Sequence, residues 1–91
     1  IAVAYPNGGE TFSHNDKITI SWNGGFSNTG IELHKDGQRI LDINGDVGNV
    51  NSFDWTIPSG VGTGNDFSIL IYDAGSGNES DESDNTFTIN E

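Results

Sequence analysis

The chain has 91 residues, no cysteine, and a formal net charge of −11 from 14 Asp and Glu against three Lys and Arg. Such a charge repels phosphate backbones and anionic lipid headgroups, so nucleic acid is not expected as a partner. No stretch approaches the roughly 18–20 apolar residues of a membrane span, so membrane insertion is not expected either. The missing cysteines exclude a disulfide framework and a thiolate metal site.

The length fits one domain covering residues 1–91. The chain starts directly in a strand-like run, so we expect a single module excised from a longer multidomain protein. Its composition is acidic and rich in small polar residues, with 13 Gly and 11 Asn. A hydrated acidic surface stays soluble where charge is screened, which favours a secreted, extracellular protein.

Apolar and polar residues alternate with period two in several short runs bounded by turn residues, which is typical of half-buried strands. The first run covers residues 2–5 and ends at Pro6, which cannot donate to a ladder. A short segment at 10–13 follows, and the next run covers residues 17–23. This run places three side chains on one face and predicts them as core: Ile18, Ile20 and Trp22.

Two runs at residues 31–35 and 38–43 flank the dipeptide Asp36-Gly37. Asp-Gly between alternating runs is a strong signal for a β-hairpin, because a type I′ turn needs φ > 0 at both central positions. We therefore predict a hairpin there, after a loop covering residues 24–30.

The second half of the chain predicts three more strands, at residues 53–57, 66–73 and 85–90. In the longest one, Phe67, Ile69 and Ile71 share one face, and Ser68, Leu70 and Tyr72 share the other. Residues 74–84 are rich in glycine, serine and acids, and we expect a solvated loop with a mobile tip. The sequence thus predicts an all-β fold, an antiparallel β-sandwich of about seven strands.

The order of these strand and turn segments along the chain resembles that of a known family. The family is the Ig-like β-sandwich of the Ser/Thr-rich GPI-anchored fungal wall proteins of the Kre–Knh type, with related accessory modules of bacterial secreted enzymes and surface proteins. That resemblance implies an Ig-like fold and association with carbohydrate or cell wall, but it supplies no contact residues. The residues that carry it are Pro6, Gly8, Phe12, Ile18, Ile20, Trp22, Leu33, Trp55, Pro58, Phe67, Ile69, Phe87 and Ile89.

Sugar binding requires an exposed aromatic platform with polar side chains beside it. Trp22 and Trp55 fall in phase with core residues, so Tyr72 is the better candidate. If the hairpin neighbours the 66–73 strand, outward side chains would line a shallow groove with Tyr72. The candidate carbohydrate-binding residues are Tyr72, His34, Arg39, Glu32 and Lys35.

The cations in this set allow two readings. Lys35 and Arg39, with His34, would meet a sulfate or carboxylate on an algal or wall polysaccharide. An equally simple account has them forming salt bridges to Glu32 and Asp42.

Four acidic residues near the last two strands form a candidate calcium site, since Ca²⁺ takes six to eight oxygen ligands from flexible loops. They are Asp73, Asp81, Glu82 and Asp84. An ordinary solvated acidic face explains the same run. We expect no catalytic residues, because no nucleophile motif or metal-hydrolase motif is present and the acids sit mostly in loops.

The sequence therefore favours a non-catalytic carbohydrate-binding module that targets a secreted enzyme to a polysaccharide. Its expected partners are that polysaccharide and the neighbouring domains of the parent chain. The alternative is a structural Ig-like spacer or sorting module of a bacterial surface protein, stabilised by calcium.

Overall fold

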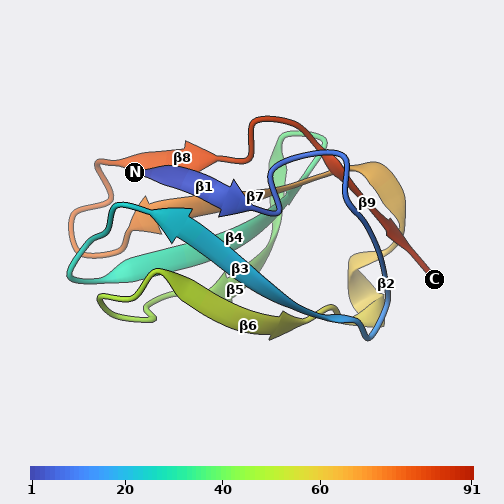
Figure 1. The fold of residues 1–91 in the computed structure, drawn as a ribbon, viewed down its shortest axis with the longest axis horizontal. Coiled ribbons are helices and arrows are strands. Elements are labelled where there is room, and N and C mark those ends of the chain that lie inside the picture. Colours follow the sequence, from blue (N-terminus) through green and yellow to red (C-terminus); the bar gives the residue numbers. More distant parts are fainter.

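Two β-sheets pack face to face in the computed structural model, which describes residues 1–91 (Figure 1). The small sheet has the strand order β1-β3-β6, and the large sheet has the order β2-β9-β7-β4-β5, with β8 beside β7. The strand bounds are β1 Ala2–Tyr5, β2 Thr11–Ser13, β3 Lys17–Asn23, β4 Thr29–Lys35, β5 Gln38–Asn44, β6 Ser52–Thr56, β7 Gly64–Asp73, β8 Ser80–Glu82 and β9 Phe87–Asn90. A 3-10 turn, η1 (Ser59–Val61), precedes β7. The predicted β-sandwich is confirmed.

The core lies between the sheets and is built from the inward half of each alternating run. Trp22 and Trp55 are both buried, as their phase predicts. The alternation matters because a shift of one residue in strand pairing would turn the inward side chains of that strand to solvent. The 14 buried hydrophobic residues are Val3, Phe12, Ile18, Ile20, Trp22, Ile31, Leu33, Trp55, Ile57, Phe67, Ile69, Ile71, Phe87 and Ile89.

The predicted hairpin joins β4 and β5. Asp36 has φ 52° and Gly37 has φ 78°, the positive values that a type I′ turn requires. On its other side β4 pairs antiparallel with β7 along its whole length, from Thr29 opposite Asp73 to Lys35 opposite Phe67. The hairpin therefore lies next to the longest strand, as a shared outer face would need.

Three details of the sequence prediction are wrong. The structure has nine strands, because Thr11–Ser13 and Ser80–Glu82 also pair. The β2–β9 pair is parallel, because the chain crosses from the small sheet to the large one at the turn after Pro6. Residues 74–84 are not a loop throughout, since β8 forms there against Leu70–Tyr72.

The acidic run is held in place by specific partners of its polar groups, both within β8 and just after it. Ser83 is buried; its Oγ donates to the Pro6 carbonyl at 2.8 Å and accepts from the Ile69 N–H at 3.0 Å. The Asp81 carboxylate accepts from the Val3 N–H at 2.8 Å. These bonds connect the large sheet to β1 of the small sheet along one side of the sandwich.

The opening Pro-Asn-Gly-Gly-Glu segment completes this connection. The Glu10 carboxylate accepts from the N–H groups of Asn7 and Gly8, at 2.9 and 2.8 Å. The Asn7 side chain accepts from the Asp84 N–H at 2.8 Å. Gly8 has φ 136°, and a Cβ there would lie 2.5 Å from the Asn85 Cβ, so only glycine fits the turn without displacing its neighbour.

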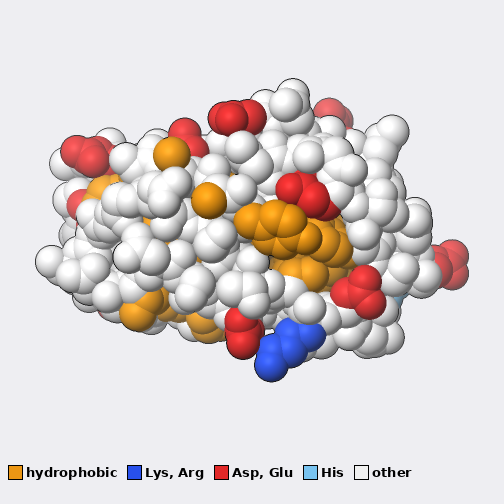
Figure 2. All heavy atoms as spheres, in the orientation of Figure 1, with side chains coloured by type: hydrophobic (Ala, Val, Ile, Leu, Met, Phe, Trp, Pro, Cys, Tyr) orange, Lys and Arg blue, Asp and Glu red, His pale blue; other side chains and the backbone are white.

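The molecule is elongated, with extents of 35 × 21 × 19 Å, and its two termini lie near opposite ends of the long axis (Figure 1). Figure 2 shows the small-sheet side, where acidic side chains are spread over the surface and an apolar patch lies near the middle. Tyr5, 41% exposed, is an exposed aromatic of β1 and contacts the Phe12 ring edge-on. No helix here is long and apolar enough to cross a membrane.

The Ser83 hydroxyl gives a direct test of this side of the sandwich. Ser83→Ala removes the partner of a buried backbone N–H, so we expect the free energy of unfolding to fall by about 1–3 kcal/mol. Ser80→Ala in the preceding strand β8 is the control; Ser80 is exposed, and the change should stay within about 0.5 kcal/mol. Urea unfolding followed by tryptophan fluorescence measures both, and equal effects would contradict the role given to Ser83.

Candidate functional site

Most of the predicted carbohydrate-binding residues meet on the outer face of the large sheet. Tyr72 lies on β7, Glu32 and His34 lie on β4, and Arg39 lies on β5. Register brings them together: Gly30 is opposite Tyr72, and Arg39 is opposite His34. Alternation along each strand then directs these side chains away from the core.

Tyr72 lies across the strand beside it. A Cβ added at Gly30 would be 2.1 Å from Tyr72 Cζ and 2.5 Å from its hydroxyl oxygen. The phenol ring therefore occupies the space above Gly30 and extends toward β5. The residue remains partly exposed, so the tyrosine forms a low aromatic platform on the sheet.

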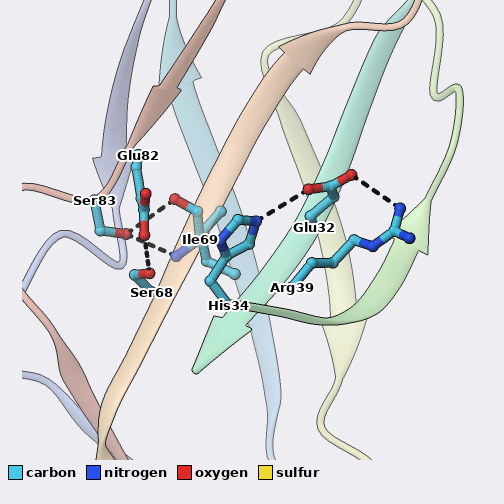
Figure 3. A network of polar contacts seen from close by, with 7 residues as sticks. All are labelled: Glu32, His34, Arg39, Ser68, Ile69, Glu82 and Ser83. Atoms are coloured by element: carbon cyan, nitrogen blue, oxygen red, sulfur yellow. Dashed lines mark hydrogen bonds and ion pairs between the residues drawn. The ribbon is translucent and has the colours of Figure 1, made fainter. Parts of the chain in front are cut away.

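Beside this platform, Glu32 holds two neighbours (Figure 3). His34 Nε2–H donates to Glu32 Oε1 at 3.0 Å, and Arg39 Nη1 lies 3.5 Å from Glu32 Oε2. The Glu32 side chain is only 16% exposed, whereas Arg39 is 61% exposed. The carboxylate is thus fixed within the face, and the guanidinium lies at its rim.

The surroundings of Tyr72 are strongly acidic. Burial raises the pKa of its hydroxyl above the ordinary value of 10.0, and the carboxylates of Asp42 and Glu32 raise it further. The positive charge of Arg39 acts in the opposite direction, and Asp46 adds a smaller upward effect. Asp42 and Asp46 were not among the predicted site residues; Asp42 faces this side because it lies opposite Glu32.

Lys35 does not lie with the others. It follows His34 directly and so points to the opposite face, in register with the core residue Phe67. Its Nζ lies 2.8 Å from the Asp66 carboxylate and 5.1 Å from the centroid of the Phe67 ring. Its inclusion in the predicted face was wrong, because neighbouring residues of a strand alternate between faces.

The four acids of the expected calcium site are not brought together, and no group of three or more acidic or histidine side chains is arranged to hold a metal ion. Each has a separate partner. Asp81 accepts from Val3, Asp84 from the Asn7 side chain, and Glu82 from the Ser68 hydroxyl. Asp73 accepts from the Ser76 hydroxyl in its own turn, a bond that lowers the Asp73 pKa.

Gly30 is the residue of this face that sequence reasoning missed. It was predicted to end a loop, whereas β4 begins at Thr29 and includes it. An isolated glycine within a strand marks a close approach of another group, and here that group is the Tyr72 ring. The isolated glycine was visible in the sequence, but Gly30 lay just outside the predicted strand.

Comparison with known proteins informs the fold. No family model matches the chain, and no curated protein matches it, so the likeness to the fungal wall-protein family is not supported. A solved structure described as fibronectin(III)-like modules of Clostridium thermocellum CbhA superposes with a TM-score of 0.50 and 14% identity, covering 99% of this chain and 98% of that one. The fold is an Ig-like β-sandwich of the fibronectin(III)-like kind. At this identity the likeness extends to the fold alone.

A double-mutant cycle tests the contact between the ring and Gly30. Gly30→Ala should destabilise the domain by about 1–3 kcal/mol, because the new methyl group displaces the ring. In the Tyr72→Ala background the same change should cost at least about 0.5 kcal/mol less. Gly60→Ala is the control, since a Cβ there meets nothing within 4 Å. Additive effects in urea unfolding would show that the ring does not cover Gly30.

The raised Tyr72 pKa predicts the stability of the domain in alkali. The unfolded chain releases the phenolic proton near pH 10, before the folded protein does, so this hydroxyl lowers stability as pH rises above 10 and has no effect below it. Tyr72→Phe should therefore flatten the fall in the free energy of unfolding above that pH. The difference in phenolate absorbance between the folded wild-type and Tyr72→Phe proteins should have its midpoint above pH 10. A midpoint at or below 10 would contradict the acidic, partly buried setting.

Proposed function

We propose that this domain is a non-catalytic accessory module that binds a polysaccharide along the outer face of the large sheet. The single observation that carries the proposal is the Tyr72 ring lying over Gly30, partly exposed in the face of the sheet. An aromatic face supplies the apolar surface on which a pyranose ring stacks. The structure contains no enclosed pocket, so the ligand would lie on an open surface, as a long polymer can.

Hydrogen-bonding groups flank this platform on the β5 side. Glu32 and Asp42 supply acceptors, and the exposed Arg39 guanidinium supplies donors. Hydroxyl groups of a sugar both donate and accept, and bonds to charged groups are stronger than neutral ones. A stacking surface with fixed polar groups at its edge is the arrangement that orients a glycan.

The setting of the module in a larger protein is part of the same proposal. Its termini lie near opposite ends of the long axis, an arrangement suited to serial connection with other domains (Figure 1). The fold neighbour is described as one of the modules of CbhA. We place the domain in a secreted multidomain protein, where holding an enzyme on its substrate raises its effective concentration.

The position of the termini near opposite ends of the domain also favours a second candidate function, that of a structural spacer without a ligand. In that case Tyr72 would serve only to cover Gly30 and the face of the sheet. The spacer hypothesis predicts that the domain binds no polysaccharide and that substitutions at Tyr72 change only its stability.

The decisive experiment is retardation of the isolated domain in native gels cast with a panel of polysaccharides. We expect retention on at least one polymer, unchanged by Tyr72→Phe and reduced about tenfold or more, equivalent to about 1.4 kcal/mol, by Tyr72→Ala. Tyr5→Ala is the matched control, because it removes the exposed tyrosine of the small sheet.

Each variant is first shown to be folded by its unfolding transition. No retention on any polymer would favour the spacer. Retention that Tyr72→Ala leaves intact would place the binding surface elsewhere on the module.

A further inference from the structure

We infer that the polysaccharide bound by the Tyr72 face is uncharged; this inference rests on the proposed function and defines its ligand class. An anionic glycan, such as a sulfated or uronate-rich polymer, needs cations that are free to pair with it. The decisive question is therefore where the few cations of this chain lie and what they already contact.

Every Lys and Arg in the chain has a carboxylate partner. Lys17 Nζ lies 3.7 Å from Asp54 on the small sheet, and Lys35 Nζ lies 2.8 Å from Asp66 on the inward side of β4. Arg39 is the only Lys or Arg on the Tyr72 face, 3.5 Å from Glu32. With three cations against 14 acids, no basic surface remains to attract a polyanion.

Arg39 is itself a poor anion site because its partner cannot move away. Glu32 is 16% exposed and also accepts from His34 at 3.0 Å, so its negative charge stays beside the guanidinium. The small exposure and the double contact hold that carboxylate in one place (Figure 3). A sulfate approaching Arg39 would meet this fixed charge at close range.

The other charged side chains around Tyr72 are also negative. Asp42 is exposed and lies opposite Glu32 in the register of the hairpin. Asp46 is also exposed, and its side chain accepts from Asn28 at 2.8 Å. Acidic groups near an aromatic ring repel an anionic polymer but accept hydrogen bonds from neutral hydroxyl groups. The groups around Tyr72 therefore suit a neutral glycan and oppose a charged one.

Matched polymers that share a backbone and differ in charge provide the test. Native affinity gels would be cast with hydroxyethyl cellulose against carboxymethyl cellulose, and with dextran against dextran sulfate, beside other neutral glycans paired with their sulfated derivatives. We expect retention on at least one neutral polymer, and at least about tenfold weaker retention on its anionic counterpart.

Salt separates the chemistry of the site from general repulsion of an acidic protein. At about 1 M salt the Debye length is about 3 Å, so long-range repulsion is screened. We expect the neutral polymer to be retained equally at low and high salt, and the anionic one to be retained at least about tenfold more weakly at both.

Two single-charge variants complete the design. Arg39→Gln and Lys17→Gln change the net charge equally and alter cations of similar exposure, 61% and 69%, on opposite sheets. Arg39→Gln should weaken retention on the neutral polymer about two- to tenfold at any salt concentration, through the loss of charge-assisted hydrogen bonds. Lys17→Gln should leave retention unchanged.

The outcomes are distinguishable. Retention on an anionic derivative equal to or stronger than on its neutral parent would overturn the inference and leave the proposed function standing. Loss of that retention in high salt or in Arg39→Gln would assign it to pairing of the anion with Arg39. Stronger retention on an amine-bearing polymer such as glycol chitosan than on every neutral glycan would also overturn it. Failure to bind any polymer would overturn the proposed function, and this inference with it.

Discussion

The sandwich depends on hydrogen bonds that close one side of it where the backbone ladders of the two sheets do not meet. The buried Ser83 hydroxyl joins the Pro6 carbonyl to the Ile69 N–H, and Asp81 accepts from Val3 in the other sheet. Buried backbone groups need partners, so these side chains replace a missing strand contact. They also hold β8 against the end of β7 that carries Tyr72. These hydrogen bonds therefore stabilise the part of the large sheet that forms the candidate binding face.

Local pattern was sufficient for most of the fold. Period-two alternation and the Asp36-Gly37 turn predict the longer strands and the hairpin, because each depends on residues close together in sequence. β8 was missed because an acidic, serine-rich run has no such alternation. It forms by pairing with β7, and the residues that follow it, Ser83 and Asp84, bond to partners 77 residues away at Pro6 and Asn7. An isolated sequence run does not display such partners.

The candidate site was partly predictable for the same reason. Alternation placed Tyr72, Glu32 and His34 on outward positions, and strand pairing brought them to one face. Lys35 was misplaced although alternation alone assigns it to the other side. The role of Gly30 depends on register, which sets it opposite Tyr72 and is decided by the packing of the whole sheet.

The position of the termini has a mechanical consequence. In Figure 1 the chain enters through β1 at one end of the long axis and leaves through β9 at the other. Tension between the two ends would pull each terminal strand along its own length against its antiparallel neighbour, β3 for β1 and β7 for β9. Hydrogen bonds loaded in shear share the force and break together, whereas bonds that are peeled break one at a time. The domain is therefore arranged to resist stretching when both ends are tethered.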